Sequence, residues 1–519
     1  MSAIWLDEKE TRAFLQIYDS DLADLVRLVE DIGYDSRTFF IGRKCEGLDF
    51  RGSDISNVSF ANANINGAKF YRDQLITVVE TRPRSHHSAI AFPREEFEAG
   101  NKEVQPHKEG QQDNDELSQE AAYIDRAIAK KNSELFLSIN SISSFRTIKA
   151  RLSETASFVS KLTLSGTHVA DLSPIAELTG LTDLNLENIP VPDLGPISRL
   201  TGLTRLNLIG IPVVDLTPIA GLTELTHLRL ADTQVTDLRP ITGLSGMQHL
   251  ILTGTQVADL TSIARWTKLQ HLSLIGAEVA DLAPIAKMIG LHTLSLKDIP
   301  ADDLTPMVGL PVLSQLSLGN LHLADLAQIG GMTGLSSLSL TGTWVADLTP
   351  IARLTGLQTL SVKDTLVADL SPIVEFTSLR QLSLTGTQVT DLTPIAGLTR
   401  LKILSLKDTQ VADLTPIAGL TELKQLSLAG TLVVDLTPIK GLTELTQLNL
   451  SNTKVADLTP IASLTELEQL SLVGTQVADL TPIAGLTGLN RLSLTHSLVT
   501  DLAPIAELTR LNLTIHKKP

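Results

Sequence analysis

Aspartate recurs along most of this 519-residue chain at a fixed interval of 22 residues, from Asp171 to Asp501, without an insertion or a deletion. A fixed period of this size predicts a solenoid, in which each repeat packs only on its neighbours. Chain length alone would suggest roughly two to four ordinary domains, and the fixed period replaces that prediction with a single repeat architecture.

Each repeat carries the pattern of one short strand followed by a turn. A typical unit, residues 467–488, reads LEQLSLVGTQVADLTPIAGLTG. Leu467, Leu470 and Leu472 are predicted to point inward, whereas Gln469 and Ser471 face outward. One such strand cannot bury its own apolar side, but stacked copies form a parallel sheet over a continuous leucine core.

The rest of the repeat predicts how the chain returns to the next strand. Thr481 followed by Pro482 is typical of a helix N-cap and first helical residue, so we expect a short 3₁₀ or α turn there. Gly, Asp or Asn stands just before the threonine column, as at Gly474 and Asp408, and suits a backbone with positive φ. The repeated aspartates are expected to accept backbone N–H groups at the turn. A calcium role is disfavoured because one carboxylate per repeat makes a poor cage.

The consensus L-x-x-L-x-L-x-x-T-x-V-x-D-L-x-P-I-x-x-L resembles the leucine-rich repeat, and its 22-residue spacing is similar to the internalin-like class. The resemblance covers residues 159–519, or about 16 repeats. It implies an α/β solenoid: a curved parallel β-sheet with short 3₁₀ or helical return segments. It also implies that the concave face binds a protein partner.

The first 158 residues have a different character. Residues 1–45 carry amphipathic helical patterns, and residues 46–75 place Phe50, Ile55, Phe60, Ile65 and Phe70 five apart, which resembles a pentapeptide repeat with a β-helix fold. Residues 76–117 are predicted to be a flexible linker. Residues 118–158 are predicted to be a helical cap for the solenoid, since the end of a solenoid must be covered.

Composition excludes several classes of function. The chain has 42 Lys+Arg against 58 Asp+Glu, a net charge of −16, so we expect neither nucleic-acid nor membrane-surface binding. The sequence has no nucleotide-binding, hydrolase or metalloprotease motif, and Cys45 is its single cysteine, so we expect no cofactor, no metal and no enzymatic activity. The acidic N-terminus and the lack of a long apolar stretch predict a cytoplasmic protein, with secretion by a signal-less route left open.

The outward strand positions hold the candidate binding residues. His227, His249 and His271 share one column on adjacent strands, about 5 Å apart. They are interpreted as a neutral polar ladder; a transition-metal site or a pH-sensitive patch is the alternative. With Arg205, Arg229 and Ile251 beside them, they suit a partner with acidic and apolar groups.

A second candidate follows the strands of two later repeats, where Trp344 and Leu366 occupy a column that usually holds Gln. Exposed, this pair would be an apolar anchor for a partner. Burial against a neighbouring loop is the alternative.

We therefore expect a non-enzymatic recognition scaffold that binds a protein partner through the concave face. Three alternatives remain: a secreted host-directed effector or adhesin-like binder, an enzyme whose activity lies in residues 1–158, and a purely structural or self-associating solenoid. The partner and the oligomeric state do not follow from the sequence.

Overall fold

The computed structural model describes residues 69–71, 90–92, 134–138, 159–165, 171–321, 323, 326–508 and 511–514. The predicted helical segment 1–45 lies outside these residues, as do most of the pentapeptide-like segment, the linker and the cap. The chain divides into two compact units, Met1–Glu278 and Val279–Pro519.

Three strands before residue 159 are described. Strand β1 (Lys69–Tyr71) pairs in parallel with β2 (Ile90–Phe92), which falls within the segment predicted to be a linker. Strand β3 (Glu134–Ser138) falls within the predicted helical cap and pairs with β4 (Lys161–Ser165). The leucine sheet thus starts earlier than predicted, because β3 pairs with β4 and Leu135 is buried.

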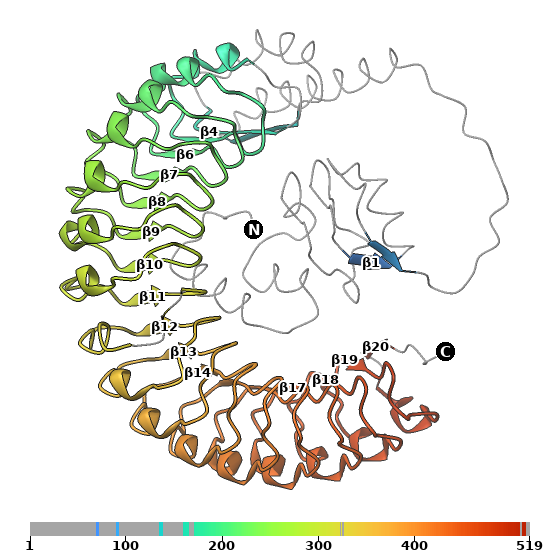
Figure 1. Ribbon diagram of the computed structural model, residues 1–519. Coiled ribbons are helices and arrows are strands. Elements are labelled where there is room, and N and C mark those ends of the chain that lie inside the picture. Colours follow the sequence, from blue (N-terminus) through green and yellow to red (C-terminus); the bar gives the residue numbers. More distant parts are fainter. Residues whose placement is uncertain are drawn as a thin grey trace, which may run out of the picture. The chain divides into compact units, whose positions relative to one another are not determined.

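The first unit continues this parallel sheet, and each strand pairs with residues 22 positions later in the next strand. Its 3₁₀ segments lie on the side opposite the strands (Figure 1). The further strands are β5 (Asp183–Asn185), β6 (Arg205–Asn207), β7 (His227–Arg229), β8 (His249–Ile251) and β9 (His271–Ser273). The 3₁₀ segments are η1 (Ser173–Ile175), η2 (Gly195–Arg199), η3 (Thr217–Ile219), η4 (Arg239–Ile241) and η5 (Thr261–Ile263).

The second unit repeats this arrangement, except that β20 pairs with β19 at an offset of 21 residues and no 3₁₀ segment is described between β11 and β12. Its strands are β10 (Thr293–Ser295), β11 (Gln315–Ser317), β12 (Ser337–Ser339), β13 (Thr359–Ser361), β14 (Gln381–Ser383), β15 (Ile403–Ser405), β16 (Gln425–Ser427), β17 (Gln447–Asn449), β18 (Gln469–Ser471), β19 (Arg491–Ser493) and β20 (Asn512–Thr514). Its 3₁₀ segments are η6 (Ala283–Lys287), η7 (Thr305–Met307), η8 (Thr349–Ile351), η9 (Ser371–Ile373), η10 (Thr393–Ile395), η11 (Thr415–Gly419), η12 (Thr437–Gly441), η13 (Thr459–Ile461), η14 (Thr481–Ile483) and η15 (Ala503–Ile505).

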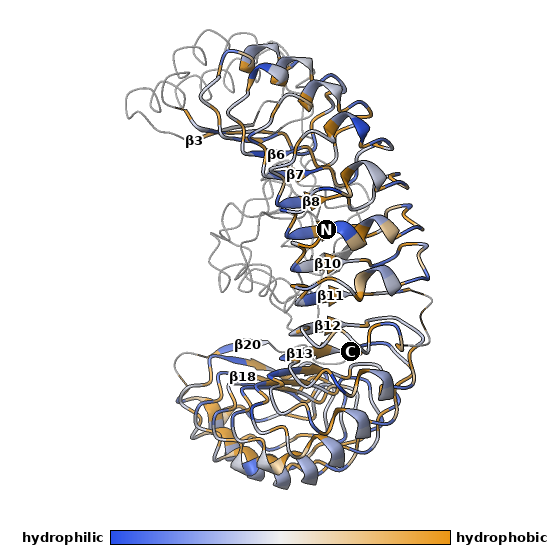
Figure 2. Cartoon of the chain, turned by 90° about the vertical axis from the view of Figure 1, so that its left-hand side faces the viewer, coloured by the Kyte–Doolittle hydropathy of each residue, from blue (hydrophilic) through white to orange (hydrophobic). Residues whose placement is uncertain are grey.

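The core is a stack of aliphatic columns between the strands and the 3₁₀ segments. Hydrophobic and hydrophilic residues alternate within each repeat (Figure 2). The predicted inward positions Leu467, Leu470 and Leu472 are buried, and the same repeat also buries Val477 and Ile483. Removing one such leucine side chain by substitution with alanine typically costs about 2–5 kcal/mol, so every repeat is held by several interactions of this size.

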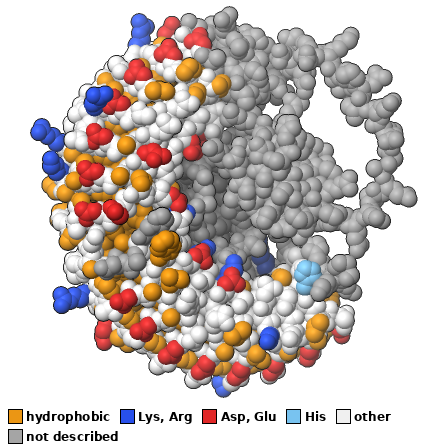
Figure 3. All heavy atoms as spheres, viewed as in Figure 1, with side chains coloured by type: hydrophobic (Ala, Val, Ile, Leu, Met, Phe, Trp, Pro, Cys, Tyr) orange, Lys and Arg blue, Asp and Glu red, His pale blue; other side chains and the backbone are white. Residues whose placement is uncertain are grey.

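The repeated aspartates perform the predicted structural role. Asp391 Oδ1 accepts the backbone N–H of Thr393 at 2.8 Å, and the same bond recurs in repeats from Asp171 to Asp501. The hydroxyl and the N–H of Thr393 both donate to this carboxylate and lower the pKa of Asp391. Acidic side chains are spread along the described repeats in the view of Figure 3.

The predicted threonine N-cap is wrong. The N-cap residue of η10 is Leu392, its side chain makes no capping bond, and Thr393 is already the first residue of the 3₁₀ segment. The oxygen that the turn needs comes instead from Asp391, one residue before the cap. An aspartate can supply it because a short carboxylate reaches the N–H two residues later.

The described turns after β5 to β19 each contain one residue with positive φ, as predicted, and these residues largely alternate between Asx and Gly. Asp364 has φ of 55° and the equivalent Gly386 has φ of 68°. A methyl group on Gly386 would overlap Asp364 Oδ1, and Gly430 stands in the same relation to Asp408. Two constraints thus require glycine at this position: the positive φ, and the side chain of the preceding repeat, which leaves no room for a methyl group.

We predict that Gly386→Ala destabilises the chain by about 1–2 kcal/mol more than Gly276→Ala. Both glycines have positive φ, but Gly276 follows Gly254, so no side-chain oxygen lies where its new methyl group would point. Denaturant titration followed by circular dichroism measures the difference. Adding Asp364→Gly to Gly386→Ala should remove the excess, and equal costs for the two single variants would contradict the explanation.

Candidate protein-recognition surface

One outward column of the first unit brings together most of the predicted site. Arg205, His227, His249 and His271 are Cα partners in adjacent parallel strands, β6 to β9. Each of these residues is followed by a buried leucine and is preceded, two positions earlier, by another buried leucine or, for His249, by Met247, so the strand register fixes where the outward side chains stand.

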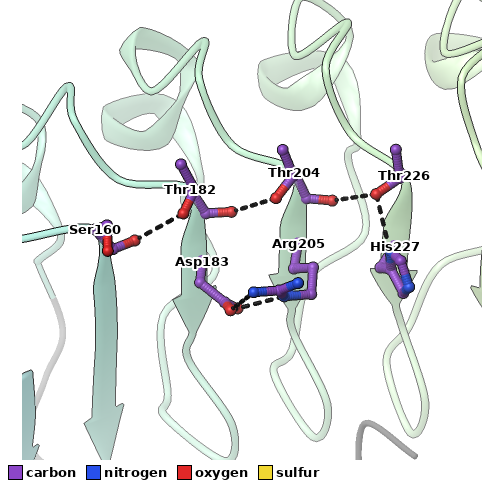
Figure 4. A network of polar contacts seen from close by, with 7 residues as sticks. All are labelled: Ser160, Thr182, Asp183, Thr204, Arg205, Thr226 and His227. Carbon is purple, nitrogen blue, oxygen red and sulfur yellow. Dashed lines mark hydrogen bonds and ion pairs between the residues drawn. The ribbon is translucent and has the colours of Figure 1, made fainter. Parts of the chain in front are cut away.

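The three histidines form a stack. The ring centroids of His227 and His249 lie 4.1 Å apart, as do those of His249 and His271, and the planes of each pair are inclined by 11°. Thr226 Oγ1 lies 2.8 Å from His227 Nδ1 and orients the first ring (Figure 4). The histidine side chains are half-buried.

Burial keeps His227 and His249 neutral near pH 7. It lowers the pKa of His227 to about 4, and the nearby cations Arg205 and Arg229 lower it further. Burial, and then the neighbouring His271 and His227, lower the pKa of His249 to about 3. Among the described residues, no group of three His, Cys, Asp or Glu side chains could hold a metal ion.

Arg205 is held by an ion pair that the sequence analysis missed. Its Nε donates to Asp183 Oδ2 at 2.7 Å, and the pair is partly exposed (Figure 4). Asp183 stands one repeat before Arg205 in the same column, so the spacing could have revealed the pair. The exposed rim of the surface is therefore a neutralised pair and not an isolated cation.

A hydroxyl ladder holds the edge of the same strands. Thr182, Thr204 and Thr226 each donate a hydroxyl to the backbone carbonyl 22 residues earlier, at 3.2, 2.9 and 3.1 Å (Figure 4). These bonds add to the backbone ladder and connect consecutive repeats directly beside Asp183 and Arg205. The surface is thus preorganised by its own backbone.

Two predicted residues in the neighbouring column differ in exposure. Ile251 is half-buried and lies beside the histidine stack. Arg229 is only 3% exposed, which differs from the exposed position that the sequence predicted. The guanidinium of Arg229 therefore acts on the site mainly through its charge, which lowers the pKa of His227 and His249.

The second predicted pair lies in the other unit. Trp344 follows β12 and is 60% exposed, and Leu366 follows β13 and is 49% exposed. Their loops are adjacent, because the Leu366 N–H donates to the Val345 carbonyl at 2.9 Å. Of the two arrangements considered for this pair, the structure shows the exposed one and not burial against a neighbouring loop.

We predict that His249→Gln makes the chain more resistant to acid. Because burial lowers the pKa of His249 to about 3 in the folded state, the contribution of its neutral ring to stability is complete above the unfolded pKa of about 6.5 and falls as the pH drops toward about 3. The test uses the upper part of this range, from about pH 6.5 to about pH 4. Thermal unfolding measured across this range should show a smaller loss for the variant than for the natural chain. Loss of the aspartate contribution occurs at lower pH, below about 4, because hydrogen bonds lower those pKa values.

The matched control is His292→Gln, since His292 is exposed and lies outside the stack. This control should leave the pH dependence unchanged. A His249→Gln profile that overlays that of the natural chain would show that the stack does not titrate as described.

The described residues contain no helix that is long and apolar enough to cross a membrane. No curated protein matches the chain in sequence. The model of the family described as "Leucine Rich repeats (2 copies)" matches residues 377–419 and 443–485.

Solved structures resemble the chain over a larger part. An internalin of Listeria monocytogenes is 28% identical over 70% of this chain and 88% of its own, with a TM-score of 0.41. A leucine-rich-repeat protein of Leptospira interrogans is 23% identical over 75% of this chain and 97% of its own, with a TM-score of 0.55, which shows a shared fold. A complex of TLR13 with ssRNA13 is 18% identical over 69% and 63%, with a TM-score of 0.52. The matched segments and the stacked strands together show that this chain is built of leucine-rich repeats.

Proposed function

We propose that this protein is a non-enzymatic recognition scaffold whose strand face binds a protein partner. The observation that carries the proposal is the register-locked sheet, in which outward side chains stand in fixed columns one repeat apart. Binding a partner to such a surface loses little conformational entropy of the scaffold, because its backbone and most of its side chains are already in place.

The surface from Asp183 to His271 is the proposed contact region in the first unit. It offers a neutralised ion pair, a ladder of neutral imidazoles and the half-buried Ile251. Removing water from neutral polar rings beside an apolar residue costs less free energy than removing water from charged groups. Arg205 is its accessible cation, and the ion pair with Asp183 holds that cation in a fixed direction.

Trp344 and Leu366 are the proposed apolar anchor of the second unit. Both side chains are large, exposed and adjacent, and aromatic anchors commonly carry much of the binding energy of an interface. This contact is a separate proposal, since the pair lies in the other unit.

The subclass of the repeat, the cellular location and an enzymatic activity of residues 1–158 are predictions from the sequence. The internalin-like class rests on the 22-residue spacing, and a cytoplasmic location competes with the secreted host-directed effector. An enzymatic activity in residues 1–158 would fall almost wholly outside the described residues.

We predict that Arg205→Glu weakens capture of the native protein partner by at least about tenfold, whereas Arg491→Glu does not. Both arginines are half-buried and occupy the same outward column, on β6 and β19, so each substitution makes the same change of charge. The full-length natural chain is used to capture partners from native lysate, and mass spectrometry identifies them. Titration of the captured partner against both variants then measures the affinities.

Circular dichroism of the two variants checks that both remain folded. Equal affinities for Arg205→Glu and Arg491→Glu, or a larger loss for Arg491→Glu, would contradict the proposed contact region. Failure of the natural chain to capture any protein would contradict the proposed function itself.

A further inference from the structure

Three cations stand in one row at the edge of the sheet in the second unit. Arg380, Lys402 and Lys424 are the residues that immediately precede β14, β15 and β16. The Lys402 N–H donates to the Arg380 carbonyl and the Lys424 N–H donates to the Lys402 carbonyl, both at 2.8 Å. The three backbones are thus directly bonded neighbours, and adjacent strands lie about 4.8 Å apart.

The row is not neutralised by an ion pair. Within the part of the chain that the structure describes, Arg380, Lys402 and Lys424 make no ion pair within 4.0 Å, in contrast to Arg205 and Arg239. Arg380 and Lys424 are exposed and Lys402 is half-buried. Arg400, exposed two residues before Lys402, adds a fourth cation beside the row.

Such a row is unfavourable for folding alone. Like charges on directly opposed residues of neighbouring strands are destabilising, and this row sets three of them in succession. Glu422, two residues before Lys424, is the acidic residue nearest to the row in the sequence. It is exposed and, among the described residues, forms no ion pair with the row.

We infer that the row of Arg380, Lys402 and Lys424, with Arg400, binds an acidic segment of a protein partner. An extended peptide that crosses the strands can place successive carboxylates against successive cations, and each long Lys or Arg side chain can adjust to meet them. This inference rests on the proposed function, because it names the chemistry of a partner for the same strand side of the repeats.

The surroundings favour a peptide over a nucleic acid. The outward strand residues beside the row are Gln381, Ile403 and Gln425, which offer no aromatic ring on which a base could stack. Four cations suffice for a short acidic segment, whereas tight nucleic-acid binding draws on more phosphate contacts.

The test uses the full chain and a fluorescein-labelled peptide of alternating Glu and Ala, with binding measured by fluorescence anisotropy. The natural chain should bind this peptide, bind a Gln–Ala peptide at least about tenfold more weakly, and lose affinity as salt is added. Lys402→Glu with Lys424→Glu should weaken binding of the Glu–Ala peptide at least about tenfold.

The matched control is Lys440→Glu with Lys454→Glu, which changes the net charge equally at exposed lysines outside the row. This control should bind the acidic peptide within about twofold of the natural chain. Lys402→Arg with Lys424→Arg should also retain binding, which separates loss of charge from loss of fold.

Absence of binding by the natural chain, or equal losses for the two charge reversals, would overturn the inference. Tighter binding of a single-stranded oligouridylate than of the Glu–Ala peptide would also overturn it, in favour of a nucleic acid. Arg205→Glu is measured in parallel and should retain peptide binding. Failure of this inference therefore leaves the proposed contact region around Arg205 to be judged on its own test.

Discussion

Burial of leucine between neighbouring repeats is the interaction on which the rest of this structure depends. A strand of three residues has too little surface to bury its own leucines, so each repeat is stable only against the repeats on either side. That dependence requires a constant register, and insertions would displace whole columns. The 22-residue period and the one-to-one strand pairing are two expressions of the same requirement.

The turns of each repeat serve that register. In the described repeats that contain a 3₁₀ segment, the aspartate accepts the first N–H of that segment, and a residue of the turn after the strand adopts positive φ to reverse the chain. Because these tasks use a few fixed positions, the outward strand residues are left free to vary. The mixed surface of Asp183, Arg205 and the histidines occupies these outward strand positions. The basic row of Arg380, Lys402 and Lys424 occupies the variable position just before each strand.

Patterns that repeat along the chain could be predicted from the sequence. The inward leucines, the positive φ and the role of aspartate follow from residue type and spacing, since each depends on a single repeat. The exposure of Arg229 could not be predicted, because the burial of a side chain depends on what surrounds it in three dimensions. The N-cap was assigned to threonine because the Thr-Pro pattern is ambiguous by one residue, and only the backbone shows that Leu392 occupies the cap.

Other features required comparison between repeats. The ion pair of Asp183 with Arg205 joins residues 22 apart, and so does the conflict between Asp364 and a side chain at Gly386. Both become visible once the sequence is written with one repeat per line. The basic row is likewise made of residues one repeat apart: Arg380, Lys402 and Lys424 are 22 residues apart in sequence and become neighbours only in the stack.

The most direct test of the account is hydroxyl-radical footprinting of the full chain, alone and with its captured partner. If the strand face of the first unit is the recognition surface, oxidation of His249 and Ile251 falls in the complex. Peptides that cover the 3₁₀ segments η3 to η5 should then be oxidised equally in both samples. Protection confined to η3 to η5, with His249 and Ile251 unchanged, would contradict the account.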